Sequence, residues 1–322
     1  MSSSQIAVIG AAMAGIIAAR KLSAAGFNPQ LFEKSRGSGG RLASKHSEMG
    51  RVNLGAQAFS ADDPQFIQEL HNWQQAGWVE CLESDTRQWT GTPYMSALTR
   101  HLLGTIKTHF ACEITSLDYV TDGWLLYDQH QQVHGPFQQL IVAIPAPQAQ
   151  ALLSHCAPKF AAHAGAVVMQ PVWMVALGFK QPISTPDNLK RLNNSTIAEV
   201  IHTPLSAQHP MQSLMLRASH SWSTEHLEDQ HEQVIAALTD ALAEQLDSPM
   251  PVADSAFAHR WRYALGALEK PLTLLADAQR GLYIAGDWCG YGDVQSAWHS
   301  GQQAAQQVID NQDTVFKPKQ PC

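Results

Sequence analysis

The N-terminal segment, residues 6–33, constrains the fold more than any other part of the chain. It opens with the apolar run Ile-Ala-Val-Ile, which stops at Gly10. Apolar and small residues then recur at helical spacing until Gly26 ends the pattern, and a second apolar run closes on Glu33. A strand, a turn, a helix and a strand within so short a span predict a βαβ unit with parallel strands and a right-handed crossover.

The turn between the first strand and the helix carries an incomplete glycine pattern. In G-x-G-x-x-G, the glycines form the tight turn, admit a pyrophosphate and let the helix pack closely on the strand. Gly10 and Gly15 occupy the outer positions, and Ala12 replaces the middle glycine. Ala12 costs about 1–2 kcal/mol if it must adopt a positive φ, and otherwise only shifts the ligand outward. The turn therefore predicts a dinucleotide whose pyrophosphate lies at the helix N-terminus, with a vestigial, ligand-free fold as the alternative.

Glu33 ends the second strand near the spacing expected for an acid that binds a ribose. A carboxylate accepts a hydrogen bond from a 2′-hydroxyl and repels a 2′-phosphate. The residue therefore favours FAD or NAD over a 2′-phosphorylated dinucleotide.

Two further motifs narrow the choice. A loop with two arginines, EKSRGSGGR over residues 33–41, follows the second strand, and GLYIAGDW over residues 281–288 precedes the last predicted helix. With them the chain resembles the glutathione-reductase-type FAD proteins of the flavin amine oxidase superfamily. More closely, the segments KSRGSGGRLASK, NLGAQAFSADD, IVAIPAPQAQALL and AGDWCGYGDVQSAWHSGQQAA resemble those of bacterial renalase-like proteins.

The resemblance implies a non-covalent FAD whose pyrophosphate lies over residues 10–15 and Arg41. It implies that Asp287 binds the ribityl chain or pyrophosphate, and that the N–H of Val294 lies near the flavin pyrimidine edge, where a helix N-terminus stabilises negative charge. The complete set of cofactor-binding residues predicted in this way is Gly10, Ala12, Met13, Ala14, Gly15, Glu33, Lys34, Arg36, Gly40, Arg41, Gly55, Ala56, Gln57, Gly286, Asp287 and Val294. Gly55, Ala56 and Gln57 belong to the segment expected to pass the flavin ring. No catalytic residue and no metal ligand is assigned.

The expected reaction is hydride transfer from a small reduced substrate to flavin N5, with O2 as the reoxidant. An isomeric dihydronicotinamide is the first substrate class and an amine the second. The chain departs from the renalase pattern at Asn53, at Ala58 and in the segment around 197–210. These departures leave open a catalytically degenerate FAD- or nucleotide-binding module with a binding or regulatory role. An NAD-dependent dehydrogenase is disfavoured, because its fold does not require the second glycine loop or the motif at 281–287.

The predicted fold is α/β: a Rossmann domain of the glutathione-reductase type with an inserted mixed-sheet substrate domain. The expected FAD-binding domain comprises residues 1–60, 95–160 and 266–312. The expected substrate domain comprises residues 61–94 and 161–265, and residues 313–322 form a flexible tail. Residues 106–143 are expected to contain a β-meander with a turn at 121–123.

Composition excludes other classes. The formal net charge is −7, whereas a nucleic-acid-binding protein usually presents a basic surface. We therefore expect no nucleic-acid partner. The longest apolar run, residues 6–19, is too short to span a bilayer, so no membrane partner is expected. Five scattered cysteines without a CxxC pair argue against a disulfide framework and favour a cytoplasmic protein. Nothing in the sequence assigns an oligomeric state.

The remaining histidines, cysteines and tryptophans that could bind a metal or a ligand are mostly expected to have structural roles. His130 and His134 lie four apart in a turn-rich segment, and no third ligand is suitably spaced, so we expect solvated surface. Cys289 is expected to be an inert buried thiol. Trp288, beside Asp287, is the one tryptophan expected near the cofactor.

Overall fold

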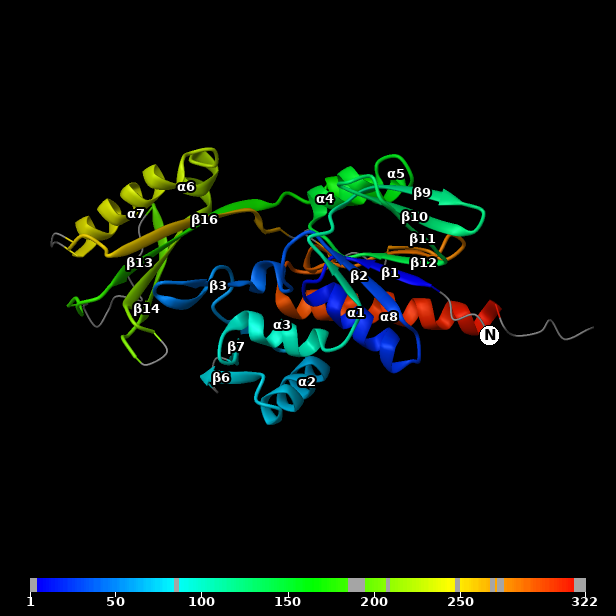
Figure 1. Cartoon of the computed structure of the whole chain (residues 1–322), viewed down its shortest axis with the longest axis horizontal. Helices are drawn as coiled ribbons and strands as arrows, with labels where there is room; N and C mark the ends of the chain where they lie inside the picture. Colours follow the sequence, from blue (N-terminus) through cyan, green and yellow to red (C-terminus); the bar gives the residue numbers. More distant parts are fainter. Residues whose placement is uncertain are drawn as a thin grey trace, which may run out of the picture. The chain divides into compact units, whose positions relative to one another are not determined.

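The computed structural model describes residues 5–83, 87–184, 195–206, 209–246, 250–266, 270 and 275–315. The chain forms two compact units (Figure 1). The first contains Met1–Leu42, Ala58–Val168 and Gly266–Cys322, and the second contains Ala43–Gln57 and Met169–Leu265. Among the described residues, no helix combines the length and apolar character needed to cross a membrane.

The first unit is built on a six-stranded sheet that begins with the predicted βαβ unit. Its strands, in spatial order, are β17 (Ala276–Asp277), β18 (Leu282–Ile284), β12 (Gln139–Val142), β1 (Ile6–Ile9), β2 (Pro29–Glu33) and β8 (Thr108–Phe110). All neighbours are parallel except β17 and β18. The carboxyl ends of β1, β2, β12 and β18 therefore meet at one edge, where open α/β sheets bind their ligands.

Two helices pack against each other beside this sheet, α1 (Met13–Ala24) and α8 (Val294–Val315) (Figure 1). They approach so closely that a β-carbon on Gly301 of α8 would lie 2.3 Å from the carbonyl oxygen of Ala14. Helix α1 begins at Met13 and ends before Gly26, whose φ of +88° suits a helix terminus. The sequence pattern therefore predicted both ends of this helix.

Smaller elements complete the first unit. An antiparallel meander consists of β9 (Ile114–Val120), β10 (Gly123–Asp128) and β11 (Val133–Phe137), and the turn at 121–123 lies where the sequence predicts it. The remaining elements are α2 (Pro64–Gln75), α3 (Met95–Leu103), α4 (Ala146–Leu153), α5 (Pro158–Gly165), and β5 (Phe59–Ser60), β6 (Val79–Glu83) and β7 (Gln88–Gly91). The side chain of Asp63 caps α2 by accepting from Gln65 N and Phe66 N.

The second unit is an antiparallel sheet covered by helices. Its strands, in spatial order, are β14 (Ile197–Thr203), β15 (Gln212–Ala218), β13 (Gln170–Phe179) and β16 (Ser255–Leu265). Helices α6 (His220–Glu225) and α7 (His231–Leu246) belong to the same unit, and Val234, Leu238 and Leu242 of α7 are fully buried in its core. A hairpin of β3 (Ser44–Ser47) and β4 (Gly50–Asn53) places Met49 in a second, methionine-rich core.

The unit boundaries differ from the predicted domain boundaries in three places, of which the shortest is residues 161–168, predicted in the substrate domain and found in the first unit. Residues 61–94, assigned by sequence to the substrate domain, pack in the first unit, where Phe66 contacts Trp73 and Trp298. Residues 43–57 belong to the second unit because Met49 is buried against its strands. Helix α8 continues through Val315, three residues into the predicted tail 313–322, and the rest of that tail lies outside the described residues.

Candidate cofactor site

The N-terminus of α1 forms the centre of the site. Its N-cap residue, Ala12, has φ −93° and ψ −172° and provides no side-chain hydrogen bond, and the first turn carries no acid. Because φ is negative, Ala12 carries none of the strain considered above. The first-turn N–H groups of a helix have no partner within the helix, so this end is suited to an anion.

Gly10 and Gly15, the two glycines of the pattern, allow the helix to start this close to the strand. A β-carbon on Gly15 would lie 1.9 Å from the carbonyl oxygen of Gly10, and one on Gly10 would lie 2.4 Å from that of Ala143. Gly10 also has φ +102°. Both positions therefore require glycine, in the roles of turn and close helix–strand packing.

Glu33 is buried at the end of β2, with 7% of its surface exposed. One carboxylate oxygen accepts from Ala11 N at 2.8 Å, and the other accepts from Ser35 N at 2.8 Å. Each oxygen has two lone pairs, so the carboxylate can also accept from hydroxyl groups. The backbone thus holds an acceptor for sugar hydroxyls beside the helix N-terminus.

The glycine-rich loop after β2 folds back onto the turn of the βαβ unit. Gly39 N donates to Ala11 O at 2.8 Å, and a β-carbon on Gly40, whose φ is +52°, would lie 3.0 Å from the β-carbon of Ala12. The side chains of Lys34 and Arg36 are on the exposed part of this loop. The structure therefore brings Gly40 to the helix N-terminus and leaves the two cations on the surface.

Arg41 and Asp287 form a bidentate pair, with N–O distances of 2.7 and 2.6 Å. Asp287 is 6% exposed and begins the short helix Asp287–Cys289 that follows β18. Gly286, just before it, donates its N–H to Ser300 Oγ at 3.0 Å. The sequence predicted each of Arg41 and Asp287 as a cofactor ligand but not their mutual pairing, because 245 residues separate them and only the folded sheet joins them.

Val294 is the first residue of α8, as predicted. The side chain of Asp293 caps this helix by accepting from Ser296 N at 2.7 Å. The side chain of Gln295 accepts from the N–H groups of Asp62 and Asp63, both at 2.9 Å. The sequence analysis missed both the cap by Asp293 and the anchor by Gln295.

Gly55, Ala56 and Gln57 belong to the second unit. The side chain of Gln57 donates to Asn53 O and Gly55 O, both at 2.9 Å, so it stabilises its own segment. The expectation that this segment passes the flavin ring stays a prediction.

Trp288 is a core residue. Its side chain is fully buried, and its Nε1–H donates to Ile144 O at 3.0 Å, so it offers no surface for direct contact with a ligand. The thiol of Cys289 is partly rather than fully buried. Desolvation, followed by the charge of Asp287, raises the pKa of Cys289 to about 12.

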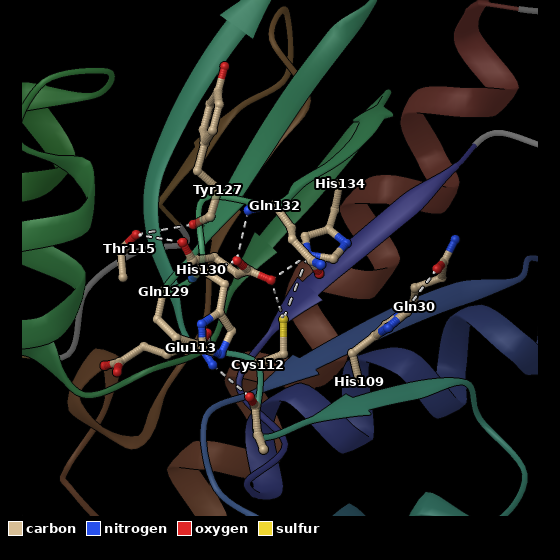
Figure 2. Close-up of polar contacts among 12 residues, drawn as sticks. Gln30, His109, Cys112, Glu113, Thr115, Tyr127, Gln129, His130, Gln132 and His134 are labelled. Carbon is tan, nitrogen blue, oxygen red and sulfur yellow. Dashed lines mark hydrogen bonds and ion pairs between the residues drawn. The ribbon is translucent and has the colours of Figure 1, made fainter.

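The structure also corrects the interpretation of His134 as solvated surface. Its side chain is 21% exposed and its Nε2 lies 3.1 Å from Asp128 Oδ2. Cys112 Sγ lies 3.8 Å from both of these atoms (Figure 2). Sequence spacing could not reveal this cluster, because Cys112 and Asp128 lie on different sides of a hairpin. His130 is exposed, as the sequence analysis expects.

The residues at the sheet edge fit an adenine dinucleotide. They provide an uncapped helix N-terminus, glycines where a β-carbon would collide with the backbone, and a buried carboxylate for a ribose. An Arg–Asp pair lies at the end of a third strand of the same edge. The fit concerns the adenosine and pyrophosphate half of the ligand.

Comparison with known proteins identifies the class. Residues 83–309 match the family described as flavin containing amine oxidoreductase, and residues 8–72 match an NAD(P)-binding Rossmann-like domain. The chain belongs to the flavin containing amine oxidoreductase family. It is an FAD-dependent oxidoreductase that acts on a small molecule, and FAD is its cofactor.

Three solved structures share the fold. A putative protoporphyrinogen oxidase from Exiguobacterium sp. 255-15 has a TM-score of 0.69 at 12% identity, covering 96% of this chain and 100% of that one. Cyclohexylamine oxidase from Brevibacterium oxydans IH-35A has a TM-score of 0.68 at 10% identity, with coverage of 97% and 100%. A fatty acid isomerase from P. acnes that produces CLA has a TM-score of 0.65 at 14% identity, with coverage of 94% and 98%. At these identities the likeness establishes the fold alone.

Proposed function

We propose that this chain is a renalase-like oxidase that takes a hydride from a small reduced substrate and uses dioxygen as its reoxidant. An isomeric dihydronicotinamide is the first substrate class, and an amine is the second. The chemistry that FAD supplies when bound is acceptance of the hydride at N5 and return of the electrons to dioxygen. The protein contributes binding, orientation and electrostatics.

The observation that carries the proposal is the position of the buried Glu33 carboxylate beside the uncapped N-terminus of α1. In this proposal Glu33 accepts from the hydroxyls of the adenosine ribose, and the first-turn N–H groups of α1 donate to the pyrophosphate. Arg41, oriented by Asp287, adds positive charge at the pyrophosphate. The N-terminus of α8 at Val294 stabilises negative charge on the reduced cofactor.

The substrate classes rest on different support. The dihydronicotinamide rests on the resemblance of residues 34–45, 53–63, 141–153 and 285–305 to renalase-like proteins. The amine rests on the family match and on the name of one structural neighbour, cyclohexylamine oxidase. A cytoplasmic location, part of the same proposal, rests on the scattered cysteines.

The second candidate is a flavin-binding module without turnover. It is favoured by the departures from the renalase pattern, of which Asn53 and Ala58 lie next to the segment expected at the flavin ring. Both candidates require bound FAD, so turnover alone distinguishes them.

An absorption spectrum of the purified protein, before and after incubation with FAD and desalting, tests cofactor retention. The holoprotein is then mixed anaerobically with each dihydronicotinamide isomer and with a set of amines. We expect the flavin band to bleach with one substrate class and to recover when air is admitted. A retained band that no compound bleaches would overturn the oxidase in favour of the binding module, and a protein that cannot be loaded with FAD would overturn both.

A further inference from the structure

The cluster of Cys112, Asp128 and His134 lies apart from the residues assigned to the cofactor. Cys112 follows β8, Asp128 ends β10 and His134 lies in β11, so three different segments deliver one side chain each. Cys112 and Asp128 are buried, and His134 is partly exposed. Figure 2 shows Cys112 and His134 pointing toward one another, whereas His109 is directed at Gln30, with which it forms a hydrogen bond.

The geometry distinguishes this cluster from a nucleophile–base–acid triad. In such a triad the histidine uses one ring nitrogen for the nucleophile and the other for the acid. Here Nε2 of His134 faces both Cys112 Sγ, at 3.8 Å, and Asp128 Oδ2, at 3.1 Å. One nitrogen cannot relay a proton between them, so a proton-relay role does not fit.

Three potential ligand atoms instead converge on one point. Sγ, Nε2 and Oδ2 all lie within 4.8 Å of one another. At the usual zinc distances of about 2.3 Å to sulfur and 2.0–2.2 Å to nitrogen and oxygen, tetrahedral ligands are separated by about 3.3–3.6 Å. The separations of 3.1 and 3.8 Å bracket that range, so the three atoms form one face of a tetrahedron with only small side-chain adjustments.

Neighbouring groups fix the orientation of the ligands. The other carboxylate oxygen of Asp128, Oδ1, accepts from His130 N at 2.8 Å and Gln132 N at 2.9 Å, which leaves Oδ2 directed at the cluster. The ring of Phe32 packs against that of His134 at a centroid distance of 5.1 Å. Outer contacts of this kind orient metal ligands.

From this arrangement we propose that Cys112, Asp128 and His134 form a binding site for a divalent transition-metal ion of the zinc class, with water as the fourth ligand. A thiolate and an imidazole select zinc, cobalt and related ions over magnesium and calcium, which prefer oxygen ligands. Because 21% of the His134 side chain is exposed, we expect the ion and the water to reach the cluster beside it. The ion would link the meander to the parallel sheet. Asp128 and His134 belong to the meander, whereas Cys112 is held at the sheet because its N–H donates to Glu33 O at 2.9 Å.

Cobalt titration of the purified holoprotein tests this proposal. Tetrahedral Co2+ with a thiolate ligand gives visible bands at wavelengths longer than those absorbed by the flavin. We expect the bands to saturate at one ion per chain, to disappear on addition of Zn2+ and to persist in excess Mg2+. A wild-type protein that gives no such bands would overturn the site.

Matched variants locate the ligands. Cys112→Ser and His134→Ala should abolish the bands, whereas Cys156→Ser and His130→Ala, which remove a thiol and an imidazole outside the cluster, should retain them. Bands that survive Cys112→Ser, or that disappear in a control, would contradict the assignment. If Cys112→Ser or His134→Ala fails to fold, X-ray absorption spectroscopy of the zinc-loaded wild type replaces the variants. The proposal requires one sulfur ligand together with nitrogen and oxygen ligands around the zinc. A coordination shell without sulfur would exclude it.

Discussion

Two of the buried carboxylates in the first unit, Glu33 and Asp128, have contrasting surroundings. Glu33 accepts from two backbone N–H groups at the edge of the parallel sheet. Asp128 gives one oxygen to backbone N–H groups and directs the other at an imidazole and a thiol. Backbone donors leave acceptor capacity for a sugar hydroxyl, whereas converging sulfur, nitrogen and oxygen atoms suit a cation. The groups around each buried carboxylate, rather than its burial, therefore decide which kind of ligand the site can bind.

Two cysteines of the first unit also differ in their neighbours. Cys289 lies two residues after Asp287, and desolvation is the main cause that raises the pKa of its thiol. Cys112 has the imidazole of His134 within 3.8 Å as well as Asp128. We therefore expect Cys112 to bind metal and Cys289 to remain a protonated, inert thiol.

The largest effect on stability is expected from Gly15→Ala. At the cofactor-binding edge of the parallel sheet, α1 packs on β1 through direct backbone contact, which a side chain at residue 15 would prevent. The new β-carbon would lie 1.9 Å from Gly10 O, and the helix must move away from the strand. We expect a loss of at least about 3 kcal/mol in the free energy of unfolding, measured by urea denaturation, together with loss of FAD. Gly37→Ala is the control: it lies in the exposed glycine loop with no atom within 4 Å of the new β-carbon, so a change below about 0.5 kcal/mol is expected. Equal stability of the two variants would show that α1 does not approach the turn this closely.

Glu33→Gln should weaken FAD binding by about 30- to 100-fold. The amide keeps the size of the side chain but presents N–H groups where a carboxylate oxygen accepts from the backbone, and it removes a charged acceptor from the ribose. Fluorescence titration of the apoprotein with FAD measures the change. Glu113→Gln, at an exposed position, should bind FAD like the wild type. Unchanged affinity in Glu33→Gln would remove Glu33 from the cofactor site.

Cys289 should make stability depend on pH in the alkaline range. Its pKa in the folded chain, about 12, exceeds the ordinary value of 9.0, so the fold favours the protonated thiol. The resulting stabilisation is complete below pH 9 and is lost as the pH rises toward 12, with a slope of at most about 1.4 kcal/mol per pH unit. Urea denaturation across this range should show a shallower decline for Cys289→Ala than for the wild type or for Cys81→Ala. Parallel declines in all three proteins would contradict a raised pKa at Cys289.

The smallest effect is expected from Ala12→Gly, which restores the glycine pattern. Ala12 has φ −93°, so glycine relieves no strain there, and glycine is well tolerated as an N-cap. FAD affinity should change by less than about threefold, a free-energy difference below about 0.7 kcal/mol. A large gain in affinity would show that the methyl group of Ala12 obstructs the pyrophosphate.

Local pattern was sufficient for much of the first unit. The run at residues 6–9, the helix from Met13 and the acid at Glu33 are adjacent in sequence, and each follows from hydrophobic period and turn chemistry. The meander and the start of α8 at Val294 were predictable for the same reason. These features depend on interactions between residues close in the chain, which composition and spacing encode directly.

Long-range pairing decided the rest. The sequence alone could not join Arg41 to Asp287 or bring Cys112 to His134, because strand order in the sheet and the register of the meander create those contacts. Nor could it show that residues 61–94 pack in the same compact unit as the parallel sheet, or that Trp288 is fully buried, since burial depends on what packs against a residue from elsewhere in the chain. The sequence by itself determined a βαβ unit built for an adenine dinucleotide. Which distant side chains meet around that unit, and which ligands they suit, only the tertiary structure decided.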